Sequence, residues 1–219
     1  MAVSLYDFLP LIKPIIPNVS DIQAVYHLRR ALIMFCEDTL LWLKEETGLD
    51  VVAGQREYAL SPDAGTAVVT VVDAAIGDKR LVAMPEHVLL RSYDAWDAPE
   101  ADTSSYYFLN QAKAFMLFPT PAEDQAGALT VHYAVKPQYA SSDLSVDDYL
   151  LDDWGEYLAS GAAASLQRQP GKPWTSPQDA TGNYQLFRSG IVKARIKSSA
   201  SFTTARPLVK RPIFTGRGV

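Results

Sequence analysis

The chain has 219 residues, of which 48% are hydrophobic and 21% charged, and its mean hydropathy is −0.04. These values are typical of a soluble globular protein and exclude a disordered or collagenous chain. The length allows one large domain or two small ones, either of which can bury a substantial core. The formal net charge of −5, from 20 basic and 25 acidic residues, argues against a general nucleic-acid binder.

The charge is distributed unevenly along the chain. Between Ala180 and Val219 there are eight basic residues and no acidic residue, so the preceding 179 residues carry a net charge of −13. The eight are Arg188, Lys193, Arg195, Lys197, Arg206, Lys210, Arg211 and Arg217. We therefore expect an acidic body followed by a basic C-terminal region.

Neither a disulfide nor a membrane segment is expected. Cys36 is the single cysteine, which fits a reducing cytosol. The first residues lack the basic start of a secretory signal, and Pro10, Pro14 and Pro17 interrupt the apolar stretch. No apolar run approaches the roughly 18–20 residues that span a bilayer. We expect a protein that is soluble where it is made, in the cytoplasm, with no membrane partner.

An arm and a helix are predicted first. The three prolines predict an extended or turn-rich arm over residues 1–19, too apolar to be a free tail. Ser20 and Asp21 are both suitable N-caps for a long helix. Apolar residues then follow at i, i+3 and i+4 spacing as far as Leu43. Gly48 is the expected stop, so the predicted helix spans residues 20–48.

Residues 49–140 have the pattern of a β domain. Short apolar or alternating runs between glycine and proline turns are predicted as strands. They are residues 68–72, 81–84, 87–93, 106–109, 114–118 and 129–135. Six or seven short strands indicate a small antiparallel sandwich or barrel. An acidic segment, residues 94–102, is predicted to be a loop carrying a lone tryptophan, Trp96.

Two further helices are predicted, one from Ser145 to Pro170 and one from Ser176 to Ser198. The first contains a run of small residues that permits close approach of another helix: Ser160, Gly161, Ala162, Ala163, Ala164 and Ser165. The predicted fold class is α+β. A discontinuous helical bundle of residues 20–48 and 141–198 is interrupted by an inserted β domain of residues 49–140, and an extended C-terminal tail spans residues 199–219.

Catalytic and metal-binding signatures are not found in the sequence. His27, His87 and His132 are far apart, and none has the spacing of metal ligands. Cys36 lies on the apolar stripe of the first helix and is interpreted as a small hydrophobic residue. The Gly171-Lys172 pair lacks the upstream glycine of a phosphate loop. We therefore predict no enzyme, no cofactor and no metal.

Two charged regions have open interpretations. Carboxylates gather where the second helix is predicted to start, and they form either a solvated face or one that meets a basic partner or repels a polyanion. The candidates are Asp147, Asp148, Asp152 and Asp153. The C-terminal tail is either a disordered terminus or a segment that orders when it docks on a partner. Its candidate residues are Phe202, Arg206, Leu208, Lys210, Arg211, Phe214 and Arg217.

The order of these motifs resembles the head-to-tail adaptor (connector) proteins of tailed bacteriophages. The most specific pieces are RRALIMFC in the first helix and the alanine-rich helix that ends in PGKPW, and a β region containing MLFPTP lies between them. The resemblance covers roughly residues 20–197. The nearest group is the podovirus-like adaptors, in which a β domain is inserted in a helical bundle.

The resemblance implies a structural virion protein without catalytic activity. It implies a homo-oligomeric ring, usually of twelve subunits, at the neck of the virion beneath the portal protein. The ring would continue the DNA channel, let DNA pass without specific binding, and give a platform to a downstream tail or nozzle protein. On this reading, residues 160–165 pack between subunits, the tail binds portal, and the four aspartates line an acidic channel wall.

Two other classes of function are considered. One is a carbohydrate-binding or carbohydrate-cleaving module that uses the β domain and Trp96. The other is a nucleic-acid-binding accessory protein that acts through the basic tail. A glycan binder usually needs several loop-borne aromatic residues, and a nucleic-acid binder needs basic residues on its folded body, so both fit the sequence less well.

Overall fold

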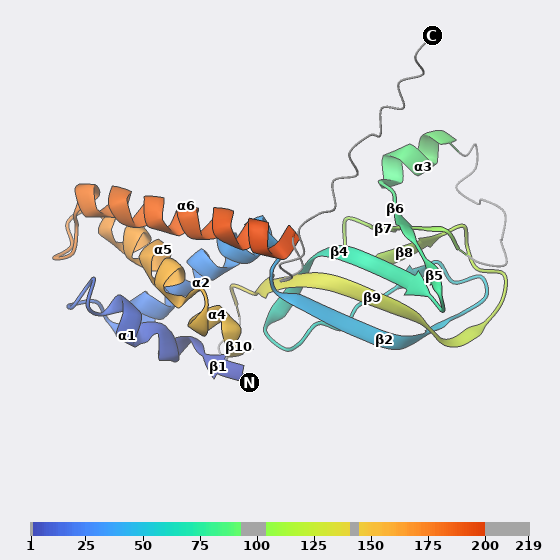
Figure 1. Cartoon of the computed structure of the whole chain (residues 1–219), viewed down its shortest axis with the longest axis horizontal. Helices are drawn as coiled ribbons and strands as arrows, with labels where there is room; N and C mark the ends of the chain where they lie inside the picture. Colours follow the sequence, from blue (N-terminus) through green and yellow to red (C-terminus); the bar gives the residue numbers. More distant parts are fainter. Residues whose placement is uncertain (1, 93–103, 141–144, 200–219) are drawn as a thin grey trace, which may run out of the picture.

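The computed structural model describes residues 2–92, 104–140 and 145–199. Figure 1 shows the helices α1, α2, α4, α5 and α6 gathered at one end of the molecule, and the strands of the two four-stranded sheets at the other. This arrangement confirms the α+β class. A continuous core runs from the N-terminal segment through the helices and into the sheets.

The N-terminal segment is folded, and the prediction of an arm without helix is wrong. It consists of β1 (Ala2–Ser4), the 3-10 helix η1 (Leu5–Phe8) and α1 (Leu9–Ile12). Pro10 lies in the first turn of α1, where a missing N–H leaves no hydrogen bond unmade. Leu5, Phe8 and Ile12 are fully buried, so this segment belongs to the core.

Helix α2 (Asp21–Thr39) starts as expected but ends nine residues before Gly48. Ser20 is its N-cap and accepts a hydrogen bond from the Gln23 N–H. Leu40 ends the helix in the left-handed conformation, with φ of 51°. The apolar helical pattern continues past this point because Leu41 and Trp42 are buried where the helices meet the sheets.

The first sheet has the strand order β2-β9-β4-β5, and all its pairs are antiparallel. Its strands are β2 (Leu43–Val51), β4 (Thr66–Ile76), β5 (Lys79–Arg80) and β9 (Gln125–Pro137). In β9, the alternating residues Leu129, Val131, Tyr133 and Val135 are all buried. Alternation along the sequence therefore predicted the buried face of this strand correctly.

The second sheet has the order β3-β8-β7-β6 and corrects two predictions. Its strands are β3 (Glu57–Tyr58), β6 (Val82–Ala83), β7 (Tyr106–Leu109) and β8 (Phe115–Phe118). Strands β6 and β7 are parallel, so the β region is not purely antiparallel. Parallel strands need a crossover connection, and this one contains a helix, α3 (Glu86–Ser92), where a strand over 87–93 was predicted. A short apolar run fits either structure, and here Leu89 packs in a small second core with Phe108 and Met116.

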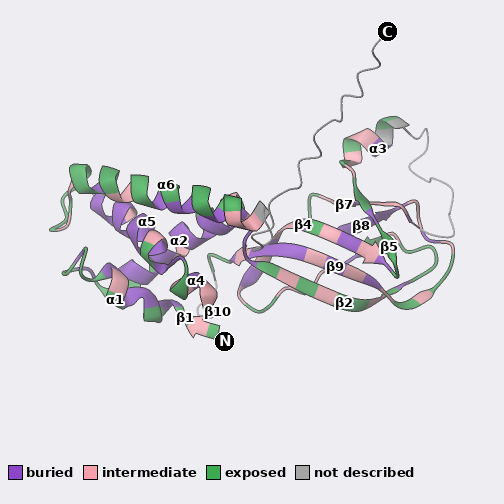
Figure 2. Ribbon diagram, in the orientation of Figure 1, coloured by how far each residue is buried: buried purple, intermediate pink, exposed green. Residues whose placement is uncertain are grey.

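The second predicted helix is divided into β10 (Ser145–Asp147), α4 (Tyr149–Asp152) and α5 (Gly155–Gln167). Strand β10 pairs with β1, and the long α6 (Pro177–Ser199) follows. Helices α2, α5 and α6 pack on one another, and Figure 2 shows that α6 exposes its outer side. None of the helices formed by the described residues is long and apolar enough to cross a membrane.

The small residues of α5 bring helices of the same chain together. Ser160, Gly161, Ala162, Ala163 and Ala164 are all buried, and only Ser165 is partly exposed. A Cβ on Gly161 would lie 2.7 Å from a ring carbon of Phe187 on α6, and a Cβ on Gly190 of α6 would lie 2.5 Å from Tyr157 of α5. Each helix thus places an aromatic ring against a glycine of the other. The close approach expected between subunits is made within one chain.

Candidate interaction surfaces

The nucleophilic and metal-ligating side chains are dispersed over the fold. His27 lies on α2, His87 on α3 and His132 on β9. Within the described residues, no three His, Cys, Asp or Glu side chains gather as they would around a metal ion. Cys36 is completely buried, and this burial raises the pKa of its thiol.

His27 connects α2 to α5 through a partly buried set of hydrogen bonds. Its Nδ1 lies 2.8 Å from Ser165 Oγ, and its Nε2 lies 2.9 Å from Gln169 Nε2. Because the Gln169 amide nitrogen donates, Nε2 accepts and the ring proton is on Nδ1. Burial, and then the charge of Arg30, lower the pKa of His27. The residue is therefore a neutral group that joins two helices.

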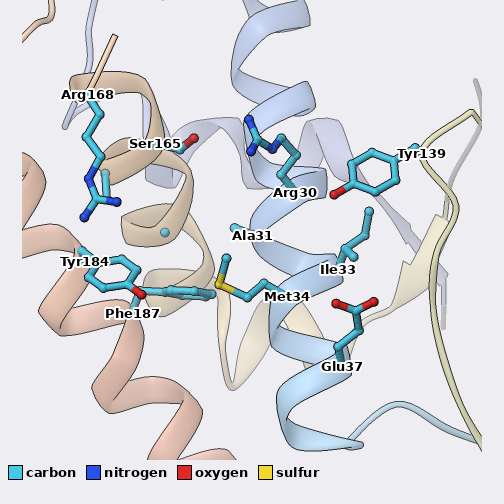
Figure 3. A pocket seen from close by; sticks show the side chains of 12 residues that line it. Arg30, Ala31, Ile33, Met34, Glu37, Tyr139, Ser165, Arg168, Tyr184 and Phe187 are labelled. Atoms are coloured by element: carbon cyan, nitrogen blue, oxygen red, sulfur yellow. The ribbon is translucent and has the colours of Figure 1, made fainter. Parts of the chain in front are cut away.

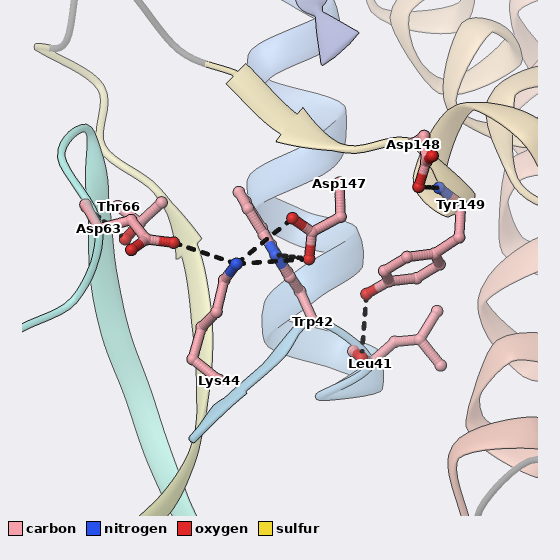
Figure 4. A network of polar contacts seen from close by, with 8 residues as sticks. All are labelled: Leu41, Trp42, Lys44, Asp63, Thr66, Asp147, Asp148 and Tyr149. Atoms are coloured by element: carbon pink, nitrogen blue, oxygen red, sulfur yellow. Dashed lines mark hydrogen bonds and ion pairs between the residues drawn. The ribbon is translucent and has the colours of Figure 1, made fainter. Parts of the chain in front are cut away.

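A junction network connects the helical and sheet regions and includes Asp147 (Figure 4). Trp42 Nε1 donates to Asp147 Oδ2 at 3.0 Å, and Lys44 Nζ lies 3.3 Å from Asp147 Oδ1 and 3.0 Å from Asp63 Oδ2. Burial alone would lower the pKa of Lys44, but the two carboxylates outweigh it and raise that pKa. The Tyr149 hydroxyl donates to the Leu41 carbonyl oxygen at 3.2 Å. Asp147 therefore has a structural role at this junction.

The other three candidate aspartates lie close to Asp147 in sequence but differ in their contacts. Asp148 accepts a hydrogen bond from the Tyr149 N–H at the start of α4. Asp153 forms an ion pair of 2.7 Å with Lys197 of α6. Asp152 is exposed beside Glu156, at a groove that Asp7 also lines. Asp152 and Glu156 thus remain as solvent-facing carboxylates of this surface.

Four of the eight basic residues between Ala180 and Val219 lie on α6 and contact other residues of the folded body. Arg188 and Arg195 pair with Asp38 of α2 at 3.7 and 3.1 Å. Lys193 Nζ donates to the Tyr157 hydroxyl at 2.7 Å. The seven tail candidates, Phe202, Arg206, Leu208, Lys210, Arg211, Phe214 and Arg217, lie outside the described residues, as does Trp96. The division into an acidic body and a basic end therefore overstated the charge of the tail.

A groove of about 380 Å³ on the helical bundle was not predicted from the sequence. Its apolar lining includes Met34 of α2, Ala164 of α5 and Phe187 of α6, and two arginines, Arg30 and Arg168, lie at its edges (Figure 3). We call this the bundle groove. Its signal in the sequence is the i, i+4 succession of Tyr26, Arg30 and Met34 on the exposed side of α2, next to a helix of small residues.

The described residues therefore offer two grooves for contacts with other molecules, a basic-edged apolar groove and an acidic groove. Such features are typical of structural proteins that act by assembly. The family model for the SU10 adaptor protein matches residues 7–211. The chain thus belongs to the SU10 adaptor protein family, a family of bacteriophage structural adaptors and not of enzymes. A comparison with curated proteins finds no match.

Proposed function

We propose that this protein is a head-to-tail adaptor of the podovirus-like type, which forms a ring beneath the portal protein at the neck of the virion. The ring continues the DNA channel and provides the platform on which a downstream tail protein attaches. The observation that carries this proposal is the family match, which spans the helices and both sheets.

Binding to portal is assigned to the C-terminal tail. Its apolar residues Phe202, Leu208 and Phe214 alternate with basic ones, and Pro207 and Pro212 disfavour a regular helix. A segment of this composition suits docking on a protein surface. The basic groups supply electrostatic attraction, and the apolar groups supply the buried anchors.

The channel wall is assigned to the acidic surface of α4 and α5. Exposed carboxylates on Asp152 and Glu156 repel the phosphates of DNA, so DNA passes without adhering. Asp147, Asp148 and Asp153 add negative charge nearby, although contacts within the subunit hold each of them. On α6, Arg188 and Arg195 share Asp38 and Lys197 pairs with Asp153, which reduces the positive field of this helix.

Co-sedimentation with purified portal protein tests the proposal. The full chain should sediment with portal rings, and a chain truncated after Ser198 should stay in the supernatant while keeping its circular dichroism spectrum. Co-sedimentation of the truncated chain would overturn the role of the tail. Failure of the full chain to bind any portal assembly from the same phage would overturn the adaptor function.

A further inference from the structure

The bundle groove has the shape and chemistry of a docking site for a peptide segment. Met34, Ala164 and Phe187 give it an apolar lining. Met34 keeps 43% of its surface exposed although it lies among apolar neighbours. A volume of about 380 Å³ is enough for one large aromatic side chain with its backbone.

The two arginines at the groove make it selective for negative charge. Arg30 and Arg168 are exposed, and neither forms an ion pair within the part of the chain that the structure describes. The guanidinium of Arg168 lies 4.6 Å from the ring centre of Tyr184, which holds it beside the groove. Glu37, the carboxylate of the groove lining, is paired with Lys136 and does not neutralise the arginines. The groove thus fits a segment that has carboxylates beside an apolar side chain.

Residues 94–102 have this composition. With the sequence DAWDAPEAD, they carry four carboxylates, no basic group and Trp96. The C-terminal tail has apolar residues too, but its arginines and lysines would meet Arg30 and Arg168 with like charge. Charge complementarity therefore favours residues 94–102 over the tail.

The occupant comes from a second copy of the chain. Residues 94–102 are joined to α3 on one side and to β7 on the other, both in the sheet region of the molecule (Figure 1). The groove lies instead between α2, α5 and α6, with Tyr139, just beyond β9, also in its lining. We infer that the bundle groove of one subunit binds residues 94–102 of its neighbour, with Trp96 among Met34 and Phe187 and the carboxylates at Arg30 and Arg168. The groove and the segment are different surfaces, so the contact is heterologous and generates a ring where the rotation closes. This inference rests on the proposed function and specifies the contact between subunits.

A binding assay with a labelled synthetic peptide of residues 93–103 tests the contact. The full chain should raise the fluorescence anisotropy of the peptide in a saturable manner. Arg30→Glu and Arg168→Glu should each weaken binding at least tenfold, because each replaces attraction by repulsion. Lys172→Glu is the matched control, since it makes the same change of charge at an exposed lysine outside the groove lining, and its Kd should stay within twofold.

The peptide offers controls of its own. Replacing Trp96 by alanine, or the four acidic residues by their amides, should weaken binding at least tenfold. A peptide of residues 205–217 from the basic tail should not bind. Absence of binding by the 93–103 peptide, or equal binding by the Arg30→Glu and Arg168→Glu variants, would overturn the inference. Displacement of the peptide by duplex DNA at physiological salt would assign the arginines to nucleic acid and would overturn it as well.

Assembly on portal separates this inference from the proposed function. The Arg30→Glu/Arg168→Glu chain should fail to form rings on portal, and so should an Asp97→Lys/Glu100→Lys chain. A chain carrying all four changes should recover rings, which misfolding of either parent would not allow. Normal rings from the arginine variants would overturn the inference and leave the adaptor function standing. If the unaltered chain forms no rings on portal, that result would instead refute the proposed function.

Discussion

Replacing Gly190 by alanine tests how α5 and α6 are held together. Alanine is favoured over glycine in a helix by about 1 kcal/mol. The new Cβ, however, would lie 2.5 Å from Cγ and 2.6 Å from Cβ of Tyr157. These atoms are at the root of the side chain, next to the backbone of α5, so a rotamer change cannot move them far enough. The helices must separate instead.

Overpacking of this kind costs about 1–3 kcal/mol, and the short distances place Gly190→Ala at the upper end. After the gain in helix propensity, we expect a net loss of about 1–2 kcal/mol in the free energy of unfolding. For a chain of this size, that corresponds to a fall in Tm of about 2–8 °C. Thermal unfolding followed by circular dichroism at 222 nm measures it.

Gly182→Ala is the matched control on the same helix. A Cβ at Gly182 meets no atom within 4 Å, so only the propensity term applies. This variant should be more stable than the unaltered chain, by up to about 1 kcal/mol. If Gly190→Ala is as stable as Gly182→Ala, the reasoning about the reciprocal glycine and aromatic contacts is refuted.

The remaining predictions concern single contacts and the partners. Asp147→Ala should lower the free energy of unfolding in urea by about 1–3 kcal/mol, because the buried Trp42 indole loses its acceptor, whereas Asp152→Ala should change it by less than about 0.5 kcal/mol. The pKa of His27 in the folded chain lies below its ordinary value of 6.5. Below pH 6.5 the unfolded chain therefore binds a proton at this residue more readily than the folded chain, and the free energy of unfolding should fall as the pH drops. His27→Gln should flatten that fall in urea titrations between pH 7 and 5. Duplex DNA should bind only weakly in a filter-binding assay at physiological salt, since the folded body is acidic.

Each of these predictions has a contradicting result. Equal stability of Asp147→Ala and Asp152→Ala would remove the structural role of the junction network. A pH profile that His27→Gln leaves unchanged would show that another group governs stability in mild acid. Tight DNA binding at physiological salt would favour the nucleic-acid accessory protein over the adaptor.

Sequence patterns predicted those elements whose signals are local. Ser20 caps α2 as expected, because a serine side chain satisfies the free N–H groups of a helix start whatever the surroundings. Strand β7 has the predicted bounds, and the alternation in β9 identifies its buried face. The α+β class follows from these elements together.

Features that depend on tertiary contacts could not be read from the sequence. Leu40 to Trp42 extend the helical stripe of α2, but Leu40 adopts the left-handed conformation and Leu41 and Trp42 are buried at the junction with the sheets, so the helix ends there. The parallel pairing of β6 with β7 depends on a crossover through α3, which a short apolar run does not reveal. The small residues of α5 predict a close helix contact, yet only the fold shows that its partner is α6 of the same chain.

The candidate surfaces, too, were predicted from the sequence only in part. The acidic residues were recognised by composition, but composition does not distinguish Asp147, which holds Trp42, from the exposed Asp152. The bundle groove joins residues from α2, α5 and α6, so no single stretch of sequence contains its pattern.

Electron microscopy of the purified chain mixed with the portal assembly of the same phage tests whether this protein is a head-to-tail adaptor. An adaptor should form a closed ring on one face of the portal, coaxial with its channel, with acidic surfaces toward the axis. Portal particles that carry no ring of this protein, under conditions in which both components are folded, would refute the adaptor function.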